Sequence, residues 1–225
     1  MIFFPLRDDI PSRTFPAIMY LVMAACGLAF YYTASLPSLG AMERLIAAYS
    51  VIPAQFTGHA PRGPAALPVR LVTSLFLHGG WVHLLGNMLF LWIFADNVED
   101  AMGHGPFAGF YLISGIVANL VHILANPLSG APTIGASGAI AGVLGAYLIL
   151  YPSARVQLFV WWLIIVRFVW VPAVLFLPVW VLLQFFLGLE SLNVPQAGGV
   201  AWWAHVGGFV SGMALARIFA PEAGR

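Results

Sequence analysis

The sequence contains no lysine, and only 8% of its 225 residues are charged. An average soluble domain has about 25% charged residues, and a domain with so few would expose large apolar patches and aggregate. The composition therefore excludes an ordinary soluble domain. The net charge of +1 also argues against nucleic acid, and against a polybasic lipid-binding surface, as the basis of function.

Cysteine is nearly absent as well, because Cys26 is the only one and lies in an apolar run. A single cysteine excludes a disulfide within the chain. We interpret Cys26 as a small hydrophobic residue of the core, since free cysteine is among the most buried residue types.

Hydrophobic residues, by contrast, make up 61% of the chain, which is typical of a membrane protein with several spans. We predict one all-α integral membrane domain over residues 1–225. The first apolar run resembles a signal peptide, but it is long enough to span and lacks a clean cleavage site, so we expect it to be retained. Six helices are expected at about residues 15–35, 81–96, 107–125, 137–151, 172–189 and 201–219.

Two segments between these helices are too irregular to span. Residues 36–75 contain five prolines between apolar patches, so we predict a long first loop that is partly embedded at the membrane interface. Residues 156–171 are apolar but include Arg167 and end before Pro172. We expect a second interfacial loop there.

Arginine positions indicate the orientation. Cytoplasmic termini place six arginines inside and three outside, which the positive-inside rule favours. The helix at 137–151 is only about 22 Å long at 1.5 Å per residue, so its N-terminus should stop within the membrane. Ser137 and His205 then lie at a similar depth near the outer face.

Ser137 stands in Gly-Ala-Ser-Gly, where a loop turns into a helix. A hydroxyl at membrane depth is costly and needs a reason. The free N–H groups of a helix N-terminus suit a developing oxyanion. The alternative is an N-cap serine with glycines that serve packing.

His205 lies in another apolar helix, beside a stripe of small residues. Such stripes let membrane helices approach closely, and the helix of Ser137 carries a matching stripe. If the stripes pack together, the imidazole can take the proton of the Ser137 hydroxyl; the alternative is a structural histidine. The glycines expected to serve this packing are Gly135, Gly138, Gly142, Gly208 and Gly212.

His83 and Asn87 are spaced i,i+4 and share one face of the second helix. Both can donate hydrogen bonds, so we expect them to stabilise an oxyanion together with the Ser137 backbone N–H. The alternative is a polar clamp between helices. Acidic residues fall at the opposite end of this helix, which predicts a Ser–His dyad and no acidic third member.

Taken together, these motifs resemble the three signatures of rhomboid intramembrane serine proteases, over about residues 70–216. The resemblance implies a six-helix fold, with Ser137 as nucleophile, His205 as base, and His83 and Asn87 in the oxyanion hole. It gives His78 a structural or water-binding role near the first loop. The motifs are Gly135-Ala-Ser137-Gly138, His83-x-x-x-Asn87 and Ala204-His205-x-x-Gly208-x-x-x-Gly212.

Two positions depart from the usual rhomboid pattern. Members often have Trp-Arg in the first loop, where this chain has Val69-Arg70. Many also have an aromatic residue four positions after the serine, stacked under the histidine, where this chain has Ala141. Either another ring, such as Phe209 or a loop aromatic, holds His205, or His205 is less firmly oriented.

The resemblance implies an endopeptidase that cuts single-span membrane proteins near the outer face of the bilayer. We expect neither a cofactor nor a metal, and no nucleic-acid partner. The short chain without a transit sequence suggests a bacterial plasma membrane. Two alternatives stay open: a non-catalytic relative that binds membrane helices, and a small transporter, although neither an inverted repeat nor a mid-span carboxylate is evident.

Overall fold

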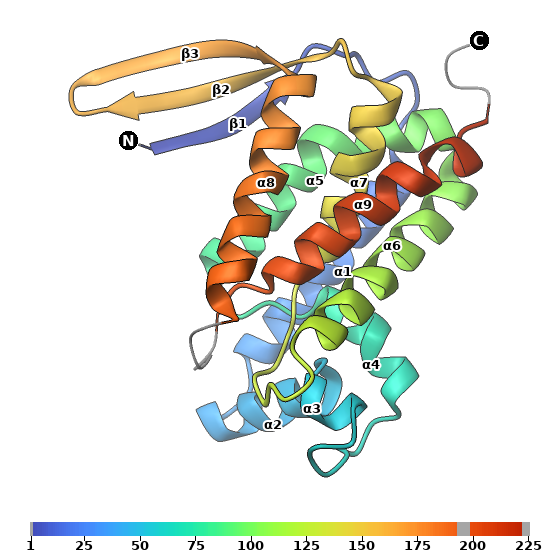
Figure 1. Cartoon of the computed structure of the whole chain (residues 1–225), viewed down its shortest axis with the longest axis vertical. Helices are drawn as coiled ribbons and strands as arrows, with labels where there is room; N and C mark the ends of the chain where they lie inside the picture. Colours follow the sequence, from blue (N-terminus) through green and yellow to red (C-terminus); the bar gives the residue numbers. More distant parts are fainter. Residues whose placement is uncertain (1, 193–198, 222–225) are drawn as a thin grey trace.

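The computed structural model describes residues 2–192 and 199–221, which form nine α-helices, one short 3-10 helix and three β-strands. The long helices form a bundle, with a group of short helices at one end and a small sheet at the other (Figure 1). The bundle comprises α1 (Ala17–Ala34), α5 (Trp81–Met102), α6 (His104–Ala125), α7 (Ser137–Leu150), α8 (Ala173–Ser191) and α9 (Trp202–Phe219).

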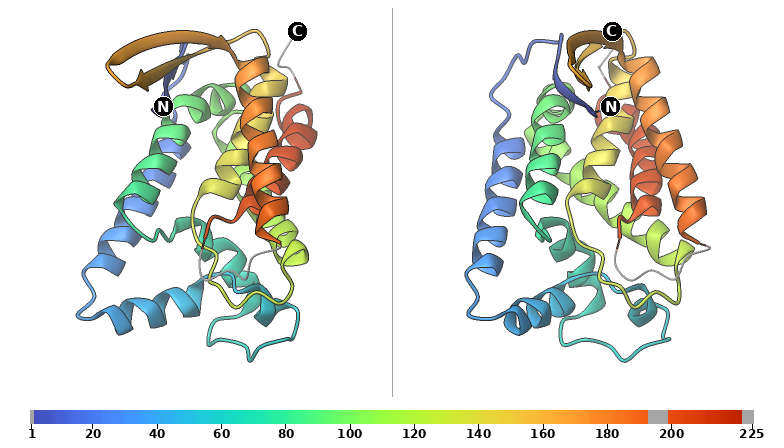
Figure 2. Two further views of the ribbon diagram at one scale, coloured as in Figure 1. Left: turned by 60° about the vertical axis from the view of Figure 1, so that its left-hand side comes forward. Right: turned by 90° about the vertical axis from the view of Figure 1, so that its left-hand side faces the viewer.

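The short helix α7 lies at the centre of the bundle. It contacts α5, α6, α8 and α9 (Figure 2), and every residue from Gly138 to Tyr147 is buried. Its closest neighbour is α9. A Cβ atom added at Gly208 or Gly212 of α9 would overlap a backbone carbonyl oxygen of α7, that of Gly138 or Gly142 respectively. The two backbones are therefore in direct contact, which only small residues permit.

Three helices, α1, α6 and α8, are long and apolar enough to cross a membrane. A fourth candidate is a broken span, in which the short helices at Leu67–Phe76 meet α5 at an angle of 85°. At 14 residues α7 is shorter than a usual span.

The expected second helix, at about 81–96, continues to Met102, because Glu99 is buried there and accepts the free N–H groups of Ile18 and Met19 at the start of α1.

The segment between α1 and α5 is largely helical. Arg70 is fully buried there, and its guanidinium donates to the Ser50 carbonyl at 2.6 Å and to the Ala47 carbonyl at 3.1 Å. A paired exchange of hydrogen bonds then joins Val51 to Thr133, just before α7. This segment therefore fixes the loop that leads to Ser137. Its elements are α2 (Leu39–Tyr49), α3 (Pro53–Phe56), α4 (Leu67–Thr73) and the 3-10 helix η1 (Ser74–Phe76).

A three-stranded antiparallel sheet differs from the sequence prediction. It consists of β1 (Ile2–Asp8), β2 (Arg155–Trp162) and β3 (Ile165–Pro172) in the order β1-β2-β3. The segment expected to be an interfacial loop is thus a β-hairpin, and the N-terminal residues pair with it. The sequence did not indicate these strands because most of β2 and all of β3 lack the alternation that marks a half-buried strand. Alternation is confined to residues 155–158 at the start of β2.

Candidate active site

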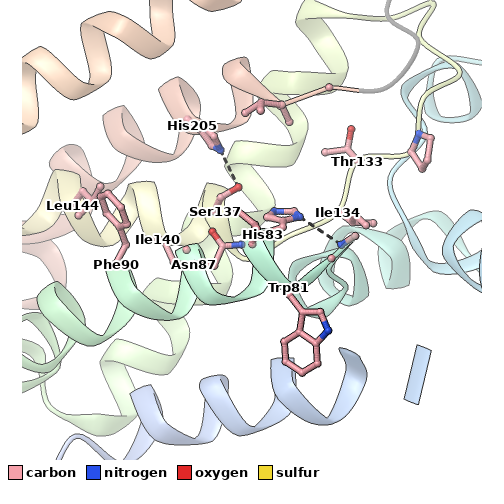
Figure 3. Close-up of a pocket in the computed structure, with 18 of the residues that line it drawn as sticks. Trp81, His83, Asn87, Phe90, Thr133, Ile134, Ser137, Ile140, Leu144 and His205 are labelled. Atoms are coloured by element: carbon pink, nitrogen blue, oxygen red, sulfur yellow. Dashed lines mark hydrogen bonds between the residues drawn. The ribbon is translucent and has the colours of Figure 1, made fainter. Parts of the chain in front are cut away.

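Ser137 and His205 are in hydrogen-bond contact across the interface of α7 and α9. The Ser137 hydroxyl lies 2.8 Å from Nε2 of His205 (Figure 3). Ser137 is the first residue of α7, and His205 lies in the first turn of α9. The contact follows from the packing of the small-residue stripes, since the Gly208 backbone, three residues after His205, touches that of Gly138.

The other ring nitrogen of His205 has a partner that the sequence analysis missed. Nδ1 lies 2.7 Å from Oε1 of Gln184 on α8, and both side chains are buried, with exposed fractions of 7% for His205 and 6% for Gln184. An amide oxygen only accepts, so Nδ1 carries the proton and Nε2 is free to accept from Ser137. Gln184 is the only polar side chain between Ala173 and Leu189, and that was the available signal.

Aromatic rings also flank His205. Its ring centroid lies 5.9 Å from that of Trp180 on α8, at an interplanar angle of 31°, and 6.1 Å from that of Trp202 on α9, at 89°. Phe209, which the sequence analysis considered for this place, instead packs against Trp180. Rings from α8 and α9 thus stand where α7 has only the methyl group of Ala141.

Asn87 of α5 is oriented by His78. Nδ1–H of His78 donates to the Phe76 carbonyl at 3.2 Å, which leaves Nε2 as an acceptor for the Asn87 amide at 2.9 Å. The amide nitrogen has two hydrogens. One is used by His78, and the second is left for an acceptor in the cavity that Asn87 lines.

His83 lies against the loop just before Ser137. Gly79 N–H contacts its Nδ1 at 3.5 Å, which leaves Nε2 as the protonated nitrogen. A Cβ atom at Gly135 would lie 2.6 Å from that Nε2, and Gly135 has φ of +122°, so a side chain is excluded on both grounds. Gly135 therefore makes room for His83, and the atoms nearest to its added Cβ belong to α5.

These side chains line one cavity of about 800 Å³. Its polar side chains are those of Ser137, His205, His83, Asn87 and Thr133. In Figure 3 the first four lie near one another, between Phe90 and Leu144 at one end and Thr133 at the other. Apolar side chains form much of the remaining wall: Phe90, Ile140, Leu144 and Trp180. Within residues 2–192 and 199–221, no three His, Cys, Asp or Glu side chains are grouped so as to hold a metal ion.

The arrangement has the parts needed for acyl transfer. A hydroxyl stands in contact with a base whose second nitrogen is held by an acceptor. N–H donors from α5 and from the start of α7 adjoin the same cavity, where an oxyanion would form.

Known proteins are similar to this chain over much of its length. Residues 67–222 match the family described as "Rhomboid domain". The chain is 32% identical over 156 residues to the rhomboid protease GluP of Bacillus subtilis (strain 168), a stretch that covers 69% of this chain and 27% of that protein. It is 40% identical over 81 residues to the putative rhomboid protease YdcA of the same organism, covering 36% of this chain and 40% of that protein.

A more distant match is the mitochondrial presenilin-associated rhomboid-like protein of Homo sapiens, 27% identical over 151 residues, or 64% of this chain and 36% of that protein. The chain thus spans well under half the length of these relatives.

Proposed function

The chain belongs to the rhomboid family, and from this membership we propose that it is an intramembrane serine endopeptidase. The observation that carries the proposal is the 2.8 Å contact between the Ser137 hydroxyl and His205 Nε2, at the edge of a cavity within an apolar helical bundle. The names of the two Bacillus relatives, which include the word protease, support the same activity class.

In the proposed reaction His205 Nε2 takes the proton of Ser137 as Oγ attacks the carbonyl carbon of the scissile peptide. The oxygen of the tetrahedral intermediate accepts hydrogen bonds from Asn87, His83 and the Ser137 backbone N–H. His205 then gives its proton to the leaving amine. Water, deprotonated by His205 in turn, attacks the ester that remains on Ser137 and releases the acid product.

The proposal includes the arrangement in the membrane. We infer six spans, formed by α1, α5, α6, α7, α8 and α9, with the α2–α4 segment partly embedded at the outer interface. The 14-residue length of α7 supports an active site below the outer surface. Both termini then lie in the cytoplasm of a bacterial cell, and the substrates are single-span membrane proteins cut near the outer face.

Covalent labelling tests the activity class directly. The purified protein in detergent, treated with a fluorophosphonate, should acquire one adduct, which mass spectrometry should locate on Ser137. Incubation with a library of single-span helices should then yield two fragments per cleaved substrate. A protein that binds the helices but neither labels nor cuts them would be a non-catalytic relative, and one that does none of these would support a transport role.

Substitution of Asn87 distinguishes between its two candidate roles, as a donor to the oxyanion and as a polar clamp between helices. We expect Asn87→Ala to lower turnover per labelled site by about 10²-fold or less, the lower end of the loss known for one such donor, because His83 and the Ser137 N–H remain. Its melting curve should stay close to that of the unmodified protein. A mutant that melts earlier but turns over at the normal rate per labelled site would assign Asn87 to the clamp.

A further inference from the structure

Gln184 is placed to control the catalytic histidine from a third helix. We propose that Gln184 is a positioning residue, which holds His205 in the tautomer and ring orientation that accept the Ser137 proton. The inference rests on the proposed function and adds a member to it, since the pair Ser137–His205 then becomes a relay of three side chains from α7, α9 and α8.

The proton count of the imidazole requires such an acceptor. A neutral ring has one N–H, and Nε2 must lack it in order to accept from Ser137. Nδ1–H therefore points into the buried interface of α8 and α9, where a donor without a partner would be destabilising. The Gln184 oxygen at 2.7 Å removes that cost and makes the productive tautomer the favoured one.

The surroundings of Gln184 keep its side chain on this face of α8. Phe185 meets Trp203 of α9 edge to face, with ring centroids 5.6 Å apart, and a Cβ at Gly188 would lie 3.2 Å from the Trp203 ring. With the Trp180 ring beside His205, these contacts tie three successive turns of α8 to α9. A neutral amide also suits this depth, because a buried carboxylate would have a large desolvation cost.

The test compares side chains of similar size at position 184. Gln184→Leu and Gln184→Met keep bulk but remove the acceptor. Turnover per labelled site should fall about 10- to 100-fold, which is at or below the lower end of the contribution of a general base, about 10²–10⁴-fold, because His205 itself remains. KM should change little, because substrate does not touch Nδ1. Leu183→Ala, an exposed neighbour on the same helix, is the matched control and should leave turnover unchanged.

The pH–rate profile of Gln184→Glu gives a further test, because a merely structural role of Gln184 would leave that profile unchanged. A carboxylate would favour imidazolium, so turnover should return in part while the acid limb of the pH–rate profile moves to higher pH. The other titratable groups that act on His205 are His83 of α5 and His122 of α6, and neither is altered. Labelling of the unmodified protein shows whether the proposed function holds. Equal rates and pH profiles in Gln184→Met and the unmodified protein would overturn the role of Gln184 alone.

The β2–β3 hairpin carries a second, independent inference. The apolar side chains of its distal part are exposed on both faces. The sheet extends sideways from the end of the bundle opposite α2 and α3 (Figures 1 and 2). So large an apolar patch would be unfavourable if it were exposed to water. The exposed residues are Trp161, Trp162, Leu163, Ile164, Ile165, Val166, Phe168, Val169 and Trp170.

The geometry points to a lipid surface as the occupant of this hairpin. β3 continues into α8 at Ala173, and α8 exposes Val174, Leu175 and Val179, so the apolar surface of the bundle runs into the sheet without a break. Tryptophan favours the membrane–water interface. The outer edge of β3 has unpaired backbone groups, which hydrocarbon excludes, so the hairpin lies at the depth of the headgroups.

The charges of the sheet agree with that depth. Arg167 is exposed on β3, and Arg7 of β1 donates to Gln157 at 3.0 Å while lying over the Trp170 ring at 5.5 Å. The hairpin contains no acidic residue. Such a surface suits anionic phospholipid headgroups.

A fluorescent label can report the depth of the β2–β3 hairpin in the bilayer. Cys26 is fully buried, so the unmodified protein serves as the labelling blank. An environment-sensitive dye on Ile164→Cys, in vesicles of phosphatidylcholine and phosphatidylglycerol, should be quenched by brominated lipid and protected from iodide. The same dye on Arg62→Cys, in the exposed loop between α3 and α4, should behave in the opposite way.

Iodide access at position 164 equal to that at position 62 would contradict contact with lipid. Protection from iodide that disappears when the protein-to-lipid ratio is lowered would also contradict it, because a second copy of the chain would then be the occupant.

Discussion

Ser137→Ala and His205→Ala should each abolish cleavage, with a loss of at least about 10⁴-fold in turnover, and the double mutant should be no worse than either single mutant. Nucleophile and base act as one unit, so removal of one member makes the other ineffective and the losses do not add. The 2.8 Å contact between Oγ and Nε2 is the basis of this expectation. The measurement is fragment formation from a single-span substrate, with folded protein quantified by its melting transition.

The melting temperatures of the mutants show whether a loss of turnover results from unfolding. Ser137→Ala removes only a hydroxyl that lines the cavity, so we expect it to melt near the unmodified protein. His205→Ala also leaves the buried Gln184 amide without its partner, so it should melt somewhat earlier. Turnover in Ser137→Ala well above background would point to another nucleophile. Losses that multiply in the double mutant would show that the two residues act separately.

The second large effect concerns the contact between α7 and α9. Gly212→Ala and Gly208→Ala should each destabilise the protein by about 3 kcal/mol or more, because overpacking commonly costs 1–3 kcal/mol and here the methyl group meets a backbone carbonyl that cannot rotate away. Displacement of α9 would also separate His205 from Ser137. Turnover should therefore fall together with the melting temperature.

Gly27→Ala on α1 is the matched control, because nothing lies within 4 Å of the added Cβ. It makes the same chemical change within a helix, so activity should stay unchanged and the melting temperature should stay the same or rise slightly, because alanine favours the helix more than glycine does. A normal melting temperature in Gly212→Ala would mean that the two helices are not in backbone contact.

The family and the chemistry-bearing residues could be inferred from the sequence because each is a local anomaly. A hydroxyl, two imidazoles and an amide in apolar helices need a reason, and the glycine stripes indicate which helices approach each other. Ser137, His205, His83 and Asn87 were predicted in this way, and all four side chains line one cavity. The distances between these side chains could not be predicted, because they depend on how three helices, α5, α7 and α9, pack together.

Gln184 was not predicted from the sequence. It is a polar side chain in an apolar helix, as His205 is, but it belongs to no recognised motif and its partner lies on a different helix. An acid or a ring was the expected neighbour of His205, whereas a neutral amide lies against its Nδ1. The tautomer of His205 makes an acceptor necessary, so the question to ask of the sequence was which buried side chain could accept.

The sheet was missed for a different reason. Strand prediction depends on alternation between a buried and a wet face, and a hairpin with apolar residues on both faces has no such period. The pairing of β1 with β2 is also remote in sequence, with Asp8 opposite Val156.

That remote pairing has a consequence for the order of events during synthesis. β1 leaves the ribosome first, but β2 follows only after α1, α5, α6 and α7 have been made. At 5–20 residues per second, β1 waits roughly 7–30 s for its partner. Closure of the sheet is then a late step, and it ties the N-terminal residues, which precede the matched rhomboid region, to the chain just beyond the helix that begins with Ser137. A ribosome-bound chain halted before Arg155 would contain Ser137 but no β2 for β1 to pair with, so an added protease should cut its N-terminal residues more readily than those of the finished protein.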